Sequence, residues 1–353
     1  MGRGDLLVVG PLPPPVTGQS VVTVRMKDIF AAEFGRTRIV NTAGYRGGSL
    51  RKILFKIRSH TTATILARRA SGVYLSVNSG AGVALTLLVA MSTPRKVPLV
   101  LHYHSYRHIR NRWVRYLAWA AGKNARHILL SRSMAEIFRT VAGLGARTIV
   151  INNAPMVPSS LVTVPSNQES SIVVGHLSNL SQEKGLGVTL DLVESMRTID
   201  PTVRAVVAGP ATTTWARDRL EAAAHTLGSS LDYRGHIDDA GKLLFFRDIT
   251  HFVFPTSYVN EAEPLVIYEA LAAGRPTVAT DVGSISEQLS YCENSRVISP
   301  DEDFVALATE YLFSIRDRVD CSVVVRRRYL DALARAESGI AEVVAFLKGL
   351  NGA

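Results

Sequence analysis

The sequence predicts an α/β protein of two domains, on the evidence of three features. Apolar segments of strand length alternate with helical patterns along the 353 residues, which is typical of parallel sheets covered by helices. A Pro- and Ser-rich stretch, 154–171, interrupts this alternation and is the expected linker. Charge divides near the same place: residues 1–165 carry 23 Lys and Arg against 4 Asp and Glu (+19), and residues 166–353 carry 17 against 26 (−9). We expect domains at 1–160 and 161–325, followed by a C-terminal helix at 326–353.

Composition excludes several classes of protein. With 47% apolar residues and a slightly positive mean hydropathy, the chain can bury two cores and is unlike disordered sequences. Two cysteines are too few for a disulfide framework. The chain enters a strand pattern without a secretory signal, and its longest apolar run, 82–91, is too short to span a bilayer. We therefore expect a cytoplasmic protein that is not integral to a membrane.

The first half of the chain has the alternating pattern of an α/β domain. We expect strands at 6–9, 73–77, 99–103, 127–130 and 148–151, and helices at 21–30, 49–60 and 81–91, the last of which is expected to be buried. The Gly- and Pro-rich turn at 10–20 joins the first strand to the first helix, an arrangement that seats phosphate groups in many α/β proteins. Gly18 lies in this turn, either to let the backbone approach a ligand or as an ordinary turn residue.

The segment 44–69 is strongly basic. It contains seven Lys or Arg residues: Arg46, Arg51, Lys52, Lys56, Arg58, Arg68 and Arg69. Apolar residues recur between them at helical spacing and predict an amphipathic helix at 49–60: Leu50, Ile53, Leu54 and Ile57. Such a helix suits an anionic membrane surface. It equally suits a solvated face that lies over the core.

Three histidines, His102, His104 and His108, cluster at the end of the strand expected at 99–103. No Asp or Glu lies near them in the sequence and their spacing matches no zinc site, so we expect no metal centre. The carboxyl ends of strands are where α/β folds place ligand contacts. For His102 and His108 we expect packing or solvent exposure.

A second α/β pattern begins at residue 172. We expect strands at 172–175, 204–208, 252–254 and 277–280, and helices at 188–198, 265–273, 301–315 and 326–347. The helix at 265–273 is almost wholly apolar, with Pro264 at its first position and Gly274 just past its end.

Two carboxylates mark this helix as a candidate site. Glu269 is its only charge, and a buried carboxylate needs a partner, which a ligand hydroxyl would supply. The free N–H groups at the start of the helix suit a phosphate or a developing oxyanion, with Glu261 in the loop before it. Structural contacts would explain both carboxylates equally well.

Glu261 and Glu269 are separated by seven residues, and this region resembles the E-x7-E region of retaining glycosyltransferases of family 4. These enzymes have the GT-B fold, two Rossmann-like domains that face each other across a cleft. The resemblance implies that Glu269 binds the ribose of a sugar nucleotide. It also implies that Glu261 and the amides of Glu263, Leu265 and Val266 face the donor sugar and diphosphate.

The chain departs from the family pattern at two points. Many members have a Gly-rich segment after the first Glu, where this chain has Ala262, Glu263 and Pro264, and Pro264 has no N–H to offer. The family's diphosphate loop reads G-R-L-x-x-x-K-G; here Lys184 matches the Lys, and Asn179 replaces the Arg. Because Asn brings no charge, stabilisation of the leaving diphosphate must rely more on Lys184 and the helix that begins at 265.

The resemblance implies further contacts at both ends of the chain. Gly18 would let the backbone approach the donor phosphates or the acceptor, and His104 resembles the donor-contacting His of the N-terminal domain. His236 and Ile237 correspond to the loop that borders the nucleotide base, and the turn at 281–283 is expected to close the site. In GT-B enzymes the last helix often crosses back to the N-terminal domain, which we expect here.

We therefore predict a retaining glycosyltransferase that moves a sugar from a nucleotide-diphosphate sugar to a saccharide or lipid-linked acceptor in surface polysaccharide or glycan assembly. The catalytic residues are Glu261, Lys184 and His104, and neither a metal nor another cofactor is expected. The basic first half predicts an anionic acceptor and a peripheral contact with an anionic membrane.

Two alternatives stay open at this point. The first is a nucleic-acid-binding protein that uses the basic half and the four arginines at 107–115 with Trp113 and Tyr116, although no known nucleic-acid-binding motif accompanies them. The second is a sugar-nucleotide epimerase on the same fold.

Overall fold

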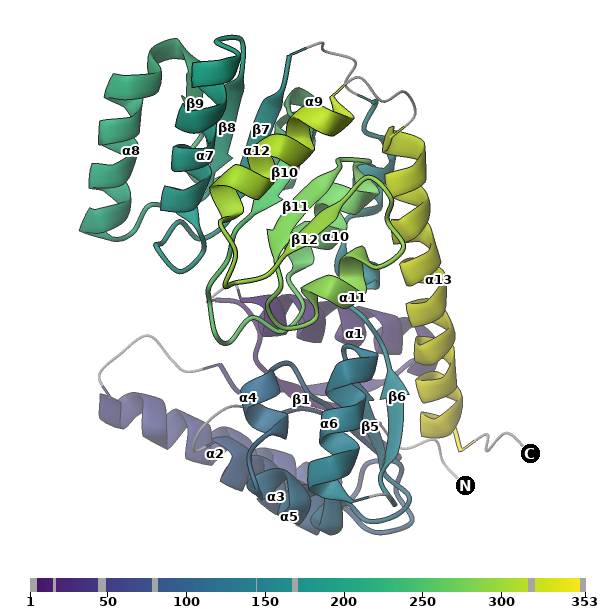
Figure 1. The fold of residues 1–353 in the computed structure, drawn as a ribbon. Coiled ribbons are helices and arrows are strands. Elements are labelled where there is room, and N and C mark those ends of the chain that lie inside the picture. Colours follow the sequence, from purple (N-terminus) through teal and green to yellow (C-terminus); the bar gives the residue numbers. More distant parts are fainter. Residues whose placement is uncertain are drawn as a thin grey trace. The chain divides into compact units, whose positions relative to one another are not determined.

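The computed structural model describes residues 5–14, 17–43, 49–77, 82–143, 145–166, 171–316 and 321–349 (Figure 1). Arg46 and the side chains of Leu50 and Lys52, named above, lie outside this description. The chain divides into two compact units: unit 1 is Met1–Met156 with Ala334–Ala353, and unit 2 is Val157–Leu333. Each unit contains a six-stranded parallel sheet with helices packed on it, which confirms the predicted fold class.

The sheet of unit 1 has the strand order β2-β1-β3-β4-β5-β6. Its strands are β1 (Leu6–Gly10), β2 (Thr37–Asn41), β3 (Gly72–Ser76), β4 (Leu99–His102), β5 (Arg126–Leu129) and β6 (Arg147–Val150). Strands β1, β3 and β4 are buried along their whole length, as expected for the centre of a parallel sheet. The five strands predicted for this sheet begin and end within one or two residues of the observed bounds. The strand of this sheet that was not predicted is β2.

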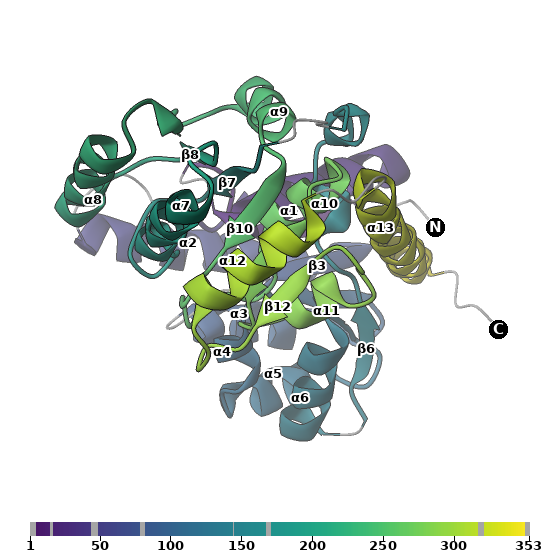
Figure 2. The ribbon, with the colours of Figure 1, turned by 45° about the horizontal axis from the view of Figure 1, so that its top comes forward.

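Helices cover both faces of this sheet. They are α1 (Gly18–Phe34), α2 (Ser49–Ala67), α3 (Gly82–Ser92), α4 (Tyr106–Ile109), α5 (Trp113–Ala121), α6 (Arg132–Ala142) and the last part of α13 (Cys321–Leu347). Helices α2, α3, α5 and α6 pack side by side in that order (Figure 2). A right-handed crossover between parallel strands places all four on one face.

Two expectations for unit 1 are corrected by the structure. Helix α1 begins at Gly18, because the Thr17 side chain accepts a hydrogen bond from the Ser20 amide and caps the helix three residues earlier than predicted. Gly18 is therefore not an ordinary turn residue. His102 and His108 are both buried, so the expectation of solvent exposure is wrong and that of packing is confirmed.

The sheet of unit 2 has the strand order β12-β11-β10-β7-β8-β9. Its strands are β7 (Val173–Leu177), β8 (Arg204–Ala208), β9 (Leu231–Tyr233), β10 (His251–Phe254), β11 (Thr277–Thr280) and β12 (Arg296–Ile298). Its helices are α7 (Leu186–Ile199), α8 (Thr214–Leu227), α9 (Asp239–Asp248), α10 (Leu265–Ala272), α11 (Ile285–Leu289), α12 (Phe304–Ile315) and the first part of α13. Strand β9 begins the segment that carries His236 and Ile237 and that was expected to be a loop. The strand was missed because an exposed edge strand has only a weak apolar signal.

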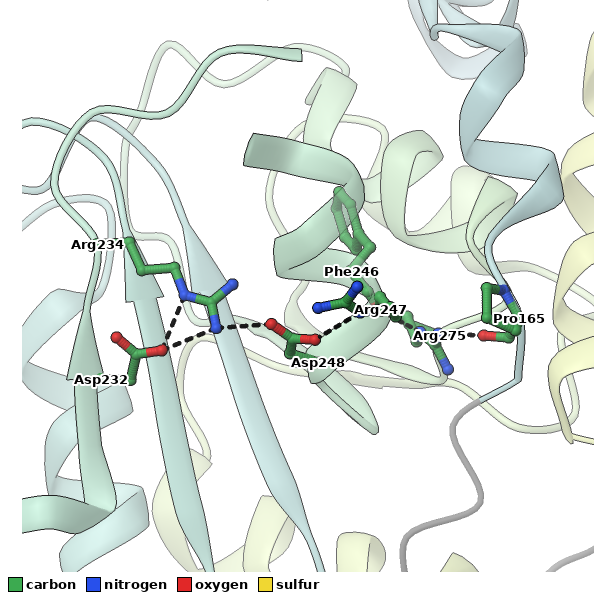
Figure 3. Close-up of polar contacts among 7 residues, drawn as sticks. All are labelled: Pro165, Asp232, Arg234, Phe246, Arg247, Asp248 and Arg275. Atoms are coloured by element: carbon green, nitrogen blue, oxygen red, sulfur yellow. Dashed lines mark hydrogen bonds and ion pairs between the residues drawn. The ribbon is translucent and has the colours of Figure 1, made fainter. Parts of the chain in front are cut away.

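Helix α9 is held to strand β9 by charged groups at its last residue. The Asp248 carboxylate accepts a hydrogen bond from Arg234 (2.9 Å), and the same guanidinium pairs with Asp232 (2.8 Å), as Figure 3 shows. Arg247 adds a second contact to Asp248 (2.9 Å). This network fixes the direction of α9, whose first turn carries a residue of the candidate site described below.

Arg275 is the largest side chain among those that are almost completely buried, at 1% exposure. Its Nε donates to the Phe246 carbonyl of α9 (2.7 Å) and its Nη2 to the Pro165 carbonyl (2.6 Å; Figure 3). Burial lowers the pKa of Arg275 to about 10, so the group remains protonated at neutral pH. This one buried side chain therefore joins α9, the turn after α10 and the segment that enters unit 2.

Across the described part of the chain, we find no helix with the length and apolar character that crossing a membrane requires.

Candidate functional site

The strand order of unit 2 places a topological switch point between β7 and β10. From β7 the chain moves through α7 to β8 on one side, whereas β10 lies on the other side of β7. The loops that leave the carboxyl ends of these two strands therefore diverge, and ligands of open α/β sheets bind where this happens. The loop after β7 contains Asn179 and Lys184, and the loop after β10 contains Glu261.

An ion pair connects the two loops. The Lys184 Nζ contacts the Glu261 carboxylate, and it also lies 4.5 Å from the ring centre of Tyr258. The side chains of Lys184 and Glu261 are 22% and 11% exposed, so both are partly shielded but reachable. The structure thus brings together two residues that were predicted for different parts of the site. Asn179 lies on the same loop as Lys184 and is exposed.

Gly185 allows these loops to approach each other. It has φ +86°, and a Cβ at this position would overlap the carbonyl group of Pro255 in the other loop. The Ser257 amide donates to the Glu183 carbonyl (2.8 Å) beside it. A left-handed conformation and a close backbone contact both require glycine here, directly after the lysine of the ion pair.

Replacing Gly185 with alanine is expected to destabilise unit 2 by about 2–3 kcal/mol, from left-handed strain plus steric overlap. Urea unfolding measures the change. Gly235→Ala is the matched control, because Gly235 is also in unit 2 and has positive φ (+62°) but a Cβ there would meet nothing within 4 Å. Its expected cost is about 1 kcal/mol. Equal costs for the two variants would contradict the importance of the contact between the loops.

Helix α10 follows the Glu261 loop. Pro264 is its N-cap residue rather than its first residue, a shift of one position from the prediction, and Gly274 follows its end with φ +69° as expected. No side chain caps the start of the helix, so the first amides, at Leu265 and Val266, have no intrahelical acceptor. The Gln288 side chain donates to the Pro264 carbonyl (3.1 Å) and positions this end.

The turn after β11 packs against the loop that contains Glu261. Gly283 has φ +66°, and a Cβ there would overlap the carbonyls of Glu261 and Ala262. The Ser284 amide donates to the Ala262 carbonyl (2.8 Å). Residues 281–283 therefore lie against the backbone of Glu261.

Glu269 has a protein partner that the sequence did not reveal. Its Oε1 accepts a hydrogen bond from the Lys242 Nζ (2.7 Å), and its side chain is 8% exposed. Lys242 lies in the first turn of α9, after the segment 235–238 that contains His236 and Ile237. His236 is exposed and Ile237 is half-buried. Lys242 is 27 positions away in sequence, so no local pattern could have paired it with Glu269.

Glu263 makes a structural contact. Its carboxylate accepts a hydrogen bond from the Tyr268 hydroxyl (3.0 Å), and the residue is 7% exposed. The side chain is thus directed back onto α10. The prediction for Glu263 concerned only its amide, as did the predictions for Leu265 and Val266, and both of these residues are half-buried.

His176 was missed because its strand, β7, extends two residues beyond the predicted end. Its Nδ1 donates to the Val253 carbonyl of β10 (3.1 Å), and its Nε2 lies 2.9 Å from the Ser178 hydroxyl. Burial, with a smaller contribution from the Lys184 charge, lowers the pKa of His176 to about 4. A neutral imidazole therefore bridges the two strands at the point from which the loops diverge.

The carboxyl edge of the unit 1 sheet carries a separate polar cluster. His104 Nε2 lies 3.0 Å from the Ser76 hydroxyl at the end of β3, and the Gln19 side chain donates to the same hydroxyl (3.0 Å). Gln19 follows Gly18 in the first turn of α1, where a Cβ on Gly18 would meet nothing within 4 Å. Burial and the neighbouring His108 lower the pKa of His104 to about 3, so this imidazole is neutral.

Within the described residues, no group of three or more His, Cys, Asp or Glu side chains is placed to hold a metal ion.

Two parallel sheets, each with polar groups at its carboxyl edge, define a doubly wound α/β protein, a class whose ligands bind at this edge. Residues 171–317 match the family described as "Glycosyl transferases group 1". This match covers 147 of the 353 residues, so it is unit 2 that resembles the glycosyltransferases of this family, while the chain as a whole has the GT-B fold, as the resemblance predicted.

Solved structures resemble nearly the whole chain, whereas the curated relatives match less than half of it. The Anabaena protein HepE, solved in complex with UDP-glucose, covers 98% of this chain and 100% of its own, with a TM-score of 0.71 and 18% identity. The lipopolysaccharide outer core galactosyltransferase WaaB covers 95% and 99%, with a TM-score of 0.67 and 14% identity. A phosphatidyl-myo-inositol mannosyltransferase of Mycobacterium leprae is 29% identical over 153 residues, 43% of this chain. The match spans only 38% of that relative's length.

Proposed function

We propose that the chain is a retaining glycosyltransferase that uses a nucleotide-diphosphate sugar bound at the carboxyl edge of the unit 2 sheet. The observation that carries the proposal is the position of the Lys184–Glu261 ion pair, on the two loops that diverge at the switch point, with the start of α10 directly after them. An ammonium group and free helix amides suit a diphosphate. The match of residues 171–317 to the glycosyltransferase family supports the same reaction class.

In the proposed mechanism, the Lys184 ammonium turns from Glu261 to the diphosphate and stabilises the negative charge that develops on the leaving group. The amino terminus of α10 adds partial positive charge, and Asn179 can donate a neutral hydrogen bond. Glu261, released from its ion pair, faces the donor sugar. Most of the rate enhancement then comes from stabilising the departing diphosphate, because these groups interact more strongly with the transition state than with the bound donor.

The nucleotide itself is proposed to lie against α9 and α10. Glu269 binds the ribose hydroxyls, and Lys242 holds its carboxylate in position through their ion pair. His236 and Ile237, on the segment just before α9, border the base. This arrangement explains why a nearly buried carboxylate is placed on an otherwise apolar helix.

Replacing Glu269 with alanine is expected to weaken nucleotide binding by about 1.5–3 kcal/mol, the loss of a charged hydrogen bond. Isothermal titration calorimetry measures the change. Lys242→Ala is the matched control, because it breaks the same ion pair but leaves the carboxylate that would bind the ribose. We expect the smaller loss of affinity for this control. Unchanged affinity in a folded Glu269→Ala protein would show that the ion pair is purely structural.

Unit 1 is proposed to bind the acceptor and to contact the donor through His104. Because its pKa is about 3, this imidazole can act as a neutral hydrogen-bond donor and acceptor but carries no positive charge near pH 7. Ser76 and Gln19 orient the ring. Gly18, at the open start of α1, would let an acceptor or phosphate group approach the backbone.

The acceptor is proposed to be anionic, and a lipid-linked diphosphate at the cytoplasmic face of a membrane fits best. The +19 balance of residues 1–165 favours a negatively charged partner. A similar protein is named as a mannosyltransferase of phosphatidyl-myo-inositol, which supports a lipid acceptor. Such a reaction would belong to the assembly of a surface polysaccharide or glycan.

Two measurements test the proposed function. A screen of nucleoside diphosphates should raise the melting temperature with one of them, because a ligand that binds only the folded state stabilises it. Incubation with the matching nucleotide sugar should then release free nucleoside diphosphate, faster when an acceptor is added. An epimerase would convert the sugar nucleotide without this release, and binding of generic DNA or RNA without any nucleotide binding would also contradict the proposal.

A further inference from the structure

Unit 1 presents large apolar side chains on the outside of three neighbouring helices. Nine such residues, between 48% and 70% exposed, form what we call the three-helix face: Ile53, Leu54, Ile57 and Ile65 on α2, Leu88 and Met91 on α3, and Trp113, Tyr116 and Trp119 on α5. Contiguous exposed apolar surface on a soluble protein marks an interaction site.

Helix α2 has its small residues inside and its large residues outside. Ala63 and Ala67 are completely buried, and Ser59 and His60 are almost completely buried. Ile53 and Ile57 are about half exposed. The apolar stripe recognised in the sequence therefore faces away from the core, and the interpretation of α2 as a solvated face lying over the core is wrong.

Helices α3 and α5 repeat this arrangement. In α3, which was expected to be a buried helix, Val89 and Ala90 face the core while Leu88 and Met91 are exposed. In α5, Val114 and Leu117 are buried, and the two tryptophans and Tyr116 are outside. The rings of Trp113 and Tyr116 lie 5.6 Å apart, centre to centre, so they form one aromatic surface.

The three helices form a continuous layer. Helix α3 packs against α2 on one side and α5 on the other, and all three lie next to one another in both views (Figures 1 and 2). Their exposed side chains are therefore on the same side of the unit 1 sheet, and the nine residues belong to one surface rather than three.

Positive charge accompanies this surface. The sequence contains no Asp or Glu between Glu33 and Glu136, a stretch that includes all three helices. Exposed basic side chains flank the apolar residues on α2 and α5: Arg51, Lys56, Arg58, Arg112 and Arg115. On α2, Arg51 and Arg58 are in line with Leu54 at helical spacing, so charge and apolar area alternate along the helix.

We infer that the three-helix face docks on an anionic phospholipid bilayer, with the aromatic side chains of α5 at the level of the headgroups. Tryptophan and tyrosine prefer the boundary between apolar and polar regions of a bilayer, and lysine and arginine bind anionic headgroups. The inference deepens the proposed function, because it would bring unit 1 to a lipid-linked acceptor. Docking itself requires no donor, so it is tested separately.

The positions of the three tryptophans provide the test. Trp113 and Trp119 lie on the three-helix face, whereas Trp215 lies on α8 of unit 2. Three variants each retain one tryptophan and have phenylalanine at the other two positions. With vesicles of phosphatidylcholine and phosphatidylglycerol, we expect the emission of Trp113 and Trp119 to shift to shorter wavelength and to be quenched by brominated lipid. Trp215 should respond to neither.

Charge reversal tests the electrostatic part. Lys56→Glu with Arg58→Glu is expected to lower vesicle partitioning more than about tenfold, and added salt should have a similar effect. Arg36→Glu is the matched control, because Arg36 is an exposed arginine of unit 1 that follows α1 and lies outside the three helices. This control should bind like the unmodified protein.

Three outcomes would overturn the inference. The first is the absence of binding to anionic vesicles, or equal binding to vesicles of phosphatidylcholine alone. The second is vesicle binding in which Trp113 and Trp119 do not respond, since another surface would then dock. The third is a spectral shift that depends on protein concentration without lipid, which would assign the face to contact between copies of the chain. Nucleotide affinity, measured without vesicles, remains the independent test of the proposed function.

Discussion

Replacing Lys184 with alanine is expected to lower the single-turnover rate of sugar transfer by about 10²–10³-fold, the usual effect of removing one group that stabilises a developing oxyanion. Lys184 lies at the switch point of the unit 2 sheet. Its ammonium contacts the Glu261 carboxylate and the Tyr258 ring, and this place is only partly shielded from solvent. The variant also leaves the Glu261 carboxylate without this counter-ion. A charge that stabilises the leaving diphosphate is thus lost at the same place where a negative charge becomes unpaired.

Asn179→Ala is the matched control for this prediction. Asn179 is on the same loop but is neutral and exposed, so its loss should cost about tenfold or less. Both variants require circular dichroism and urea unfolding to show that they are folded. Losses of equal size in the two single-turnover rates would mean that the diphosphate does not bind at Lys184.

Acidification from about pH 7 to pH 5 is expected to destabilise the protein by about 2 kcal/mol through each of three buried histidines, one in unit 1 and two in unit 2. Burial lowers the pKa of His127 to about 3 and those of His176 and His251 to about 4. The unfolded chain protonates them near pH 6.5, so between pH 6.5 and about 4 the unfolded state binds more protons. Stability therefore falls as pH falls through this window, by about 2 kcal/mol per histidine at pH 5.

Urea unfolding at a series of pH values tests this prediction. His127→Gln should reduce the slope of unfolding free energy against pH, because glutamine can keep a hydrogen bond to the Tyr103 hydroxyl but cannot titrate. His225→Gln, at an exposed position on α8, serves as the control and should leave the slope unchanged. A free energy of unfolding that is constant between pH 7 and 5 would contradict the assignment of these imidazoles as neutral.

The secondary structure of the central strands followed from local patterns. Strands β8 and β11 have the bounds predicted from their apolar segments, and the predicted glycine, Gly274, follows the end of α10. Prediction failed where the local signal was weak. The edge strands β2, β9 and β12 were missed because they are partly exposed and therefore less apolar. Gly18 was misplaced because the Thr17–Ser20 capping interaction was overlooked.

In the candidate site too, some residues could be named from the sequence, but their contacts could not. Lys184 and Glu261 were both named from the sequence, through spacing and resemblance, but their contact joins residues 77 positions apart and depends on the crossover from β9 to β10. Nothing in the sequence singled out Lys242, because it resembles any solvent-exposed lysine in the first turn of a helix. Only the packing of α9 near α10 brings it to Glu269. The role of His176 depended on which strand lies next to β7.

Residue order alone established the alternation of strands and helices and the charge difference between the two halves, since these depend on composition and spacing over short distances. A resemblance around Glu261 and Glu269 indicated the family that residues 171–317 match. The partner of each charged group and the direction of each helix face were decided by tertiary packing. Helix α2 is the clearest case: its apolar stripe is visible in the sequence, but Ala63 and Ala67 pack against the core instead. Helical periodicity indicates that one face is apolar, whereas only the neighbouring elements determine whether that face is covered.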